Sequence, residues 1–151
     1  QYTNLIYRIH FEKVPQNLLP FHLTAGRNVG LLIIVTLDHE QRPLLITTVH
    51  TCGCYLAFTP TSHMPPDAFP EKWNMDGQTV FGMKLPGRLN RMEENARPVI
   101  YLASGTHRVR DVRIMPVSSL ADRYRIVVPA IQPMAALKRL PLGDGTTSFF
   151  E

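Results

Sequence analysis

The sequence predicts a mainly β protein: an antiparallel β-sandwich-like single domain over residues 1–151, with one short C-terminal helix. Short apolar runs, either alternating or rich in β-branched residues, recur along the chain and are typical of strands. Thirteen prolines among 151 residues, nearly twice the usual share of about 5%, divide the chain into short segments. The apolar share of 44% is enough for one hydrophobic core, which excludes a disordered chain.

Three strands are expected in the first third of the chain. Residues 4–11 alternate, and their apolar side chains share one face: Leu5, Tyr7, Ile9 and Phe11. A turn over residues 24–28 precedes residues 29–37, whose nearly continuous apolar run predicts a strand buried on both faces. Residues 44–50 return through the polar connection 38–43, so the two strands are expected to form an antiparallel hairpin.

The middle of the chain is predicted to be irregular. Residues 58–73 contain four prolines and are expected to form a proline-rich cap loop that packs through its aromatic side chains. A short strand over residues 78–83 and a single helical turn over residues 89–95 are expected to follow.

Three further strands and the one helix are expected after this segment. The apolar run at 98–104, the alternating stretch at 109–115 and the β-branched stretch at 124–128 predict the strands. Residues 133–140 predict the helix, because one proline stands at its start and another directly after its end.

A histidine and two cysteines near the middle of the chain could form a metal site. On an extended strand, His50, Cys52 and Cys54 would share a face, and His107 or His63 could supply a fourth ligand. Thiolates and imidazoles are the ligands that zinc or copper prefers. Two other interpretations stay open, namely buried cysteines beside a hydrogen-bonded histidine, or a reactive thiol activated by His50.

Arginine dominates the basic residues and gathers in one part of the sequence. The formal charge of +4 falls within residues 88–125, which hold eight arginines and four acids. His107, Arg108, Arg110 and Arg113 could bind an acidic or anionic ligand, because guanidinium groups pair well with carboxylates and phosphates. Solvated strand faces with internal ion pairs are the alternative. The chain lacks a dense basic tail or helix, so nucleic acid is not an expected partner.

Two stretches resemble a known family. The sequence P-V-I-Y-L-A-S-G-T-H at 98–107 is similar to the strand end of the vacuolar-protein-sorting-associated (plant sixty-two-like) family, and T-T-V-H at 47–50 ends a strand in the same order. That family resembles the necrosis-inducing-peptide-like β-sandwich proteins. The resemblance implies a β-sandwich with His50 and His107 at neighbouring strand ends, near a cation or polar ligand. The acidic–Trp–acidic stretch of the family has no counterpart at 26–31.

These observations predict a non-catalytic binding or accessory β-domain of a larger protein or assembly, with another protein as its partner. Its site is expected where the strand ends at His50 and His107 meet the cap loop. A small metal-binding protein or metal-dependent enzyme, using the His-x-Cys-x-Cys strand end, and an arginine-based anion-binding surface are the alternatives. No apolar run approaches the roughly 20 residues of a membrane span. A start without Met and an apolar end lead us to expect a truncated chain.

Overall fold

The computed structural model describes residues 2–14 and 26–139. The chain divides into two compact units, Gln1–Ser119 and Leu120–Glu151. Strands hold 46% of the residues and helices 9%, and the strands form antiparallel sheets, so the predicted mainly β, sandwich-like class is confirmed. Within the described ranges, none of the helices combines the length and the apolar character that crossing a bilayer requires.

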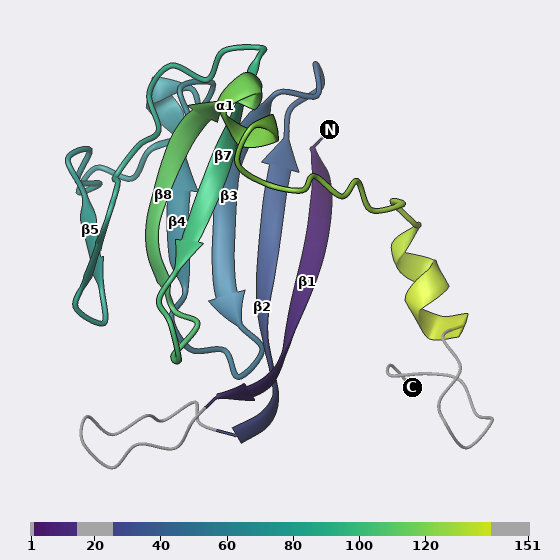
Figure 1. Ribbon diagram of the computed structural model, residues 1–151. Helices are drawn as coiled ribbons and strands as arrows, with labels where there is room; N and C mark the ends of the chain where they lie inside the picture. Colours follow the sequence, from purple (N-terminus) through teal and green to yellow (C-terminus); the bar gives the residue numbers. More distant parts are fainter. Residues whose placement is uncertain (1, 15–25, 140–151) are drawn as a thin grey trace. The chain divides into compact units, whose positions relative to one another are not determined.

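The first unit is built on a four-stranded antiparallel sheet (Figure 1). Its strands are β1 (Thr3–Val14), β2 (Gly26–Leu37), β3 (Pro43–His50) and β4 (Ala57–Pro60), paired in that order. The expected strands at 4–11 and 29–37 are confirmed but are longer than predicted. The turn expected over 24–28 is wrong at Gly26 and beyond, because these residues already pair with β1; residues 24 and 25 lie outside the described residues.

The hairpin connection between β2 and β3 is fixed by one aspartate. The Asp38 carboxylate accepts hydrogen bonds from the backbone N–H of Glu40 (2.8 Å) and of Arg42 (2.9 Å). It also pairs with the Arg42 guanidinium at 2.8 Å. Burial alone would raise the pKa of Asp38, but these hydrogen bonds outweigh it and hold the pKa below its usual value. The polar connection therefore forms a stable turn, as the sequence predicted.

The inner face of this sheet supplies one side of the core. Burial alternates along β3, with Leu44, Ile46, Thr48 and His50 pointing inward. Leu31 of β2 lies opposite His50 and is fully buried. The expectation that β2 would be buried on both faces is wrong, because its outward residues Leu32 and Ile34 remain half-buried.

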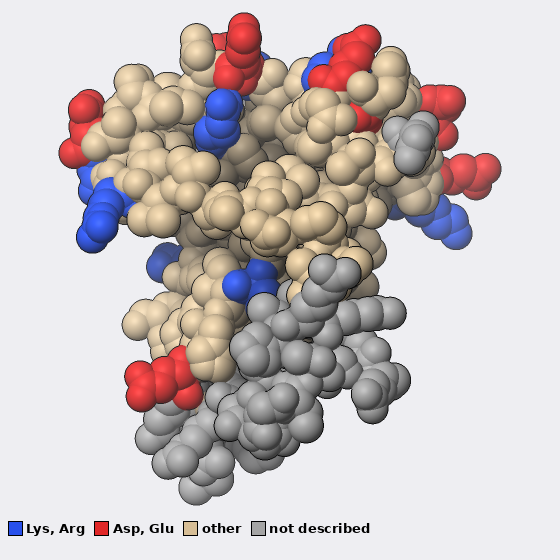
Figure 2. Space-filling view, turned by 90° about the vertical axis from the view of Figure 1, so that its right-hand side faces the viewer, with Lys and Arg blue, Asp and Glu red and all other residues tan. Residues whose placement is uncertain are grey.

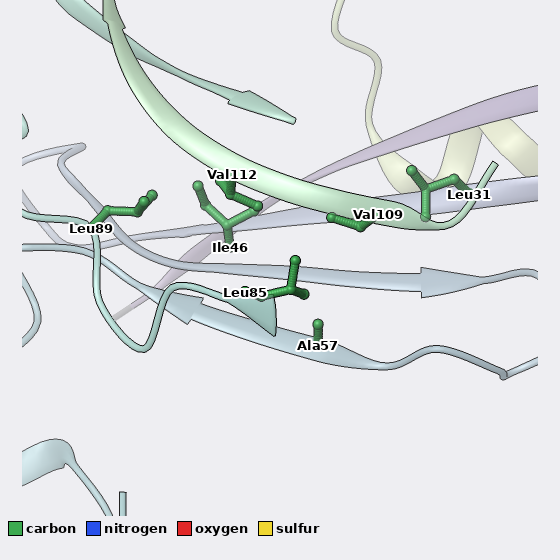
Figure 3. Packing of buried hydrophobic residues seen from close by; sticks show 7 residues of the cluster. All are labelled: Leu31, Ile46, Ala57, Leu85, Leu89, Val109 and Val112. Atoms are coloured by element: carbon green, nitrogen blue, oxygen red, sulfur yellow. The ribbon is translucent and has the colours of Figure 1, made fainter. Parts of the chain in front are cut away.

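A two-stranded antiparallel hairpin, β7 (Ala96–Leu102) and β8 (Val109–Pro116), packs on this inner face. Figure 1 shows the hairpin in front of β3 and β4, with β1 lying beyond the edge of β7. Figure 3 shows the resulting core of Leu31, Ile46, Ala57, Leu85, Leu89, Val109 and Val112. Val109 and Val112 are three residues apart, and the register shift between Tyr101 and Leu102 allows both to face the core.

The proline-rich segment 58–73 is less uniform than predicted. Its first residues belong to β4, and η1 (Pro66–Ala68) forms one 3-10 turn within it. The rest is an ordered loop fastened by the Trp73 indole, which donates to the Gly87 carbonyl at 2.9 Å. Phe69 lies 6.4 Å from Trp73, between ring centroids, so aromatic packing within this segment is confirmed.

The segment after the loop forms a small hairpin instead of one strand. β5 (Gln78–Val80) pairs with β6 (Met83–Leu85), and Gly82 turns between them with a φ of +82°. The helical turn expected over 89–95 is wrong. Arg91 has a φ of +59°, which is incompatible with a right-handed helix, and Thr61 instead bridges to Leu89.

The C-terminal region departs most from the prediction. A short helix that was not predicted, α1 (Val117–Ala121), follows β8 directly. The strand expected over 124–128 is wrong, because none of the described sheets includes these residues and a strand needs a hydrogen-bonded partner. The expected C-terminal helix is present as the 3-10 helix η2 (Met134–Arg139), while residue 140 lies outside the described residues.

The packing predicts how two aliphatic truncations differ. Ile46→Ala should lower the free energy of unfolding by about 2–5 kcal/mol, because it removes buried methyl groups from the centre of the core. Ile6→Ala, on the outer face of β1 with 44% of the residue exposed, should change it by about 0.5 kcal/mol or less. Denaturant unfolding of both variants tests this, and equal effects would contradict the assignment of inner and outer faces.

Candidate functional site

The two histidines singled out by the sequence meet at one end of the sandwich. His50 is the last residue of β3 and is 1% exposed. Its Nε2 lies 3.1 Å from the backbone oxygen of His107, in the turn between β7 and β8. Since a carbonyl oxygen only accepts, Nε2 carries the hydrogen and donates it. The end of the sheet and the end of the hairpin are thereby joined.

The His107 turn is also fastened to the first strand. The His107 ring stacks on Phe11 of β1, with centroids 4.0 Å apart and ring planes inclined by 9°. His107 adopts a φ of +55°, a backbone conformation that residues other than glycine rarely adopt. Its N–H donates to Ala103 at 2.9 Å and closes the turn. The strained backbone is thus held by contacts on both sides.

An aromatic group covers the other side of His50. The Tyr55 ring meets the His50 ring edge-on at 5.0 Å and the Phe81 ring at 4.7 Å. The Arg108 guanidinium lies 5.3 Å from the Tyr55 centroid, a cation–π distance, and donates to the Phe81 carbonyl at 3.4 Å. Tyr55 and Phe81 both have positive φ values, so backbone strain gathers at this end of the sandwich.

Buried polar atoms without a partner also gather here. Within the described part of the chain, four buried side-chain atoms lack a hydrogen-bond partner: His50 Nδ1, Thr106 Oγ1, His107 Nδ1 and Arg108 Nε. All four belong to β3, to the β7–β8 turn or to the first residues after that turn. Because buried polar groups are almost always paired, this end of the sandwich is the least optimised for stability, as functional regions often are.

His50 is held in its neutral form. Burial lowers the pKa of His50 from 6.5, and the electrostatic interactions of His50 with His107 and Arg108 act in the same direction. The hydrogen bond to the His107 carbonyl opposes them without cancelling them. A neutral His50 that donates from Nε2 leaves Nδ1 as a buried acceptor, so the residue supports the fold and is poorly suited to carry a charge.

The predicted metal ligands are not gathered into one group. β3 ends at His50, and the chain turns at once, with Gly53 at a φ of +80° and its N–H donating to the His50 carbonyl at 2.7 Å. The strand that would have aligned His50, Cys52 and Cys54 therefore stops too early. In the portion of the chain that the structure describes, no three His, Cys, Asp or Glu side chains are placed to hold a metal ion such as zinc or copper.

The cysteines are free thiols in this turn. Cys52 is exposed and Cys54 is half-buried. The hydrogen bond with the Cys52 thiol is the main factor that raises the pKa of Cys54. A raised pKa keeps a thiol protonated and slow to react, which disfavours Cys54 as a nucleophile.

The predicted arginine surface is divided. Arg108 is half-buried against Tyr55, whereas the Arg113 guanidinium lies 5.6 Å from the Tyr101 centroid and pairs with Asp111. Arg110 is exposed. On the face drawn in Figure 2, Lys and Arg side chains lie singly among acidic and uncharged residues. Internal partners therefore take up two of the three arginines that were expected to bind an anion.

The sequence did not predict an apolar groove of about 340 Å³ that runs beside the hairpin. The residues that line it are Ile9, Leu31 and Ile33 from the sheet and Pro98, Val99, Ile100 and Leu102 from β7. The inner faces of β1 and β2 form its floor. Successive residues of β7 point to opposite faces, so a groove that touches both Val99 and Ile100 runs along the edge of that strand.

Among the residues that the structure describes, no strand pairs with the edge of β7 along the groove. Val117 donates its N–H to the Asn95 carbonyl at 2.8 Å, so residues 95 and 117 form a hydrogen-bonded pair next to the β7–β8 ladder. This pair determines which residues of β7 direct their N–H and C=O toward β8. In an antiparallel pair, every second residue of a strand bonds to its neighbour. The backbone N–H and C=O of Val99 therefore point toward β8, and the backbone groups of Pro98 and Ile100 point toward the groove. Proline inside a strand is confined to edges, so Pro98 was the one signal in the sequence that could have predicted this feature.

Comparison with known proteins adds no relative: no family model, curated protein or solved structure matches this chain. The interpretation of the site depends on its own residues.

The buried histidine predicts a dependence of stability on pH. His50 has a lower pKa folded than unfolded, so the unfolded chain binds more protons below pH 6.5 and the free energy of unfolding falls as the pH falls. One such group contributes a slope of up to about 1.4 kcal/mol per pH unit. Denaturant unfolding between about pH 7.5 and 5.5 should show a weaker slope for His50→Gln than for the wild type.

The exposed His39, whose side chain is 76% accessible, provides the control. His39→Gln should keep the wild-type slope. An unchanged slope in His50→Gln would mean that another group carries the pH dependence.

Proposed function

We propose that the first unit is a binding domain that accepts an extended apolar segment of a protein as an added strand along β7. The observation that carries this proposal is the coincidence of an apolar groove with an unpaired strand edge. The edge offers the N–H and C=O of Ile100, and the floor offers apolar side chains. Strand addition uses both, because backbone bonds provide affinity and alternate side chains fill the groove.

The chemistry of the groove supports an apolar, uncharged occupant. Each of the seven lining residues is aliphatic or proline. A charged side chain facing the floor would lose its hydration without gaining a partner, which is strongly unfavourable. Alternating residues of the occupant should therefore be aliphatic or aromatic where they face Ile9 and Ile33.

In this proposal, the end of the sandwich that carries His50 and His107 holds the two sides of the groove in place. The Phe11–His107 stack joins β1, which supplies the floor, to the turn that follows β7, which supplies the edge. The contact between His50 and the His107 carbonyl holds the same turn against β3. His50 and His107 are therefore assigned a positioning role, and the domain acts as a binding or accessory module.

A labelled peptide tests the proposal. A designed fluorescent peptide, Lys-Val-Thr-Ile-Thr-Val-Lys, should bind the dilute wild-type chain with a rise in fluorescence anisotropy. Ile9→Arg places a charge on the groove floor and should weaken binding at least about tenfold. Ile6→Arg carries the same change on the opposite face of the same strand, at similar exposure (44% against 37%), and should alter binding by less than about twofold.

The matched pair makes the outcome decisive. Equal binding by Ile9→Arg and Ile6→Arg would place the peptide elsewhere and reject the groove. The absence of saturable binding by the wild type would reject strand addition altogether.

A further inference from the structure

One segment of the second unit has the sequence of a strand but pairs with no other described segment. Residues 124–128, Y-R-I-V-V, combine β-branched and aromatic residues and contain no proline, and Pro129 follows them directly. Their apolar residues are openly exposed: Tyr124 and Ile126 at 55%, Val127 at 72% and Val128 at 86%. Contiguous exposure of this kind indicates a surface that associates with another.

None of the sheets in the described residues includes 124–128, although the segment has the composition of a central strand. The same chain carries the unpaired edge of β7 beside an apolar groove. A second copy therefore offers a β7 edge to the 124–128 segment of the first copy, and a 124–128 segment to its β7 edge.

We propose that residues 124–128 of one copy add as a strand to the β7 edge of a second copy. This inference rests on the proposed strand-accepting function and names the partner as a second copy of this chain. The lengths are compatible, since the four β7 residues that line the groove lie between Pro98 and Leu102, and the donated segment has five residues. No unpaired charge needs to enter the groove.

The pattern of the segment determines which side faces inward. Side chains alternate along a strand, so Tyr124, Ile126 and Val128 share one face, and Arg125 and Val127 share the other. Only the first face is uncharged, and it is expected to contact the accessible floor residues Ile9 and Ile33. Arg125 then points to solvent. Because each copy holds a donor and an acceptor, a reciprocal exchange closes a dimer.

Sedimentation velocity on the full chain over a wide dilution series tests the assignment. The wild type should show a reversible monomer–dimer equilibrium. Ile126→Asp should raise the dimer dissociation constant at least about tenfold, because it places a carboxylate against the apolar floor. Val127→Asp, the adjacent residue on the outward face, should raise it by less than about threefold.

Mixing two variants provides the sharper test. Ile126→Asp keeps its groove but loses its donor, whereas Ile9→Arg keeps its donor but loses its groove. Each should be monomeric alone, and an equimolar mixture should form a heterodimer through one exchanged strand. Failure of the mixture to associate while the wild type dimerises would overturn the proposed exchange.

The designed peptide separates this inference from the proposed function. A wild-type chain that stays monomeric but binds the peptide would overturn strand donation and leave the groove's function intact. A monomeric wild type whose peptide affinity rises at least about tenfold in Ile126→Asp would show that the segment fills the groove of its own chain, which also overturns the second-copy proposal. A chain that neither dimerises nor binds the peptide would overturn both.

Discussion

The packing of the β7–β8 hairpin on the inner face of the four-stranded sheet is the interaction on which the rest of the first unit depends. A two-stranded hairpin is barely stable by itself, so its position must come from contacts with the sheet. Val109 and Val112 supply the apolar contacts, and the His107 turn supplies the fixed end, stacked on Phe11 and bonded to His50. Without these contacts neither a core nor a groove would exist.

The same packing creates the candidate site. Within the described residues of the first unit, two strands packed on four do not cover the whole sheet, and the groove lies over the inner face of β1 and the adjacent side of β2. Ile9, Leu31 and Ile33 line the floor of the groove, where Leu31 also belongs to the core, and the edge of β7 forms its wall. The strained, incompletely paired turn at His107 fixes the end of this wall. The packing of the β7–β8 hairpin on the sheet therefore determines both the stability of the first unit and the shape of the groove.

Local patterns in the sequence predicted the parts of the fold that local forces determine. The β2–β3 hairpin was predictable because the polar connection at Asp38 and the apolar run before it are both encoded within a few residues. The groove was not, since it depends on which strands the hairpin covers. The predicted metal ligands do not share one strand face, because the strand ends at His50 before Cys52. Residues 124–128 have the composition of a strand but join none of the described sheets, because a strand also needs a neighbouring strand to bond to.

The free edge of β7 is the central claim, and amide hydrogen exchange measured residue by residue tests it most directly. In the dilute chain, the Val99 amide should be protected by its bond to β8, and the Ile100 amide should exchange rapidly. Saturating the groove with a strand peptide should protect Ile100 and leave Val99 unchanged. An Ile100 amide already protected in the dilute chain, or one unaffected by a bound peptide, would contradict the account.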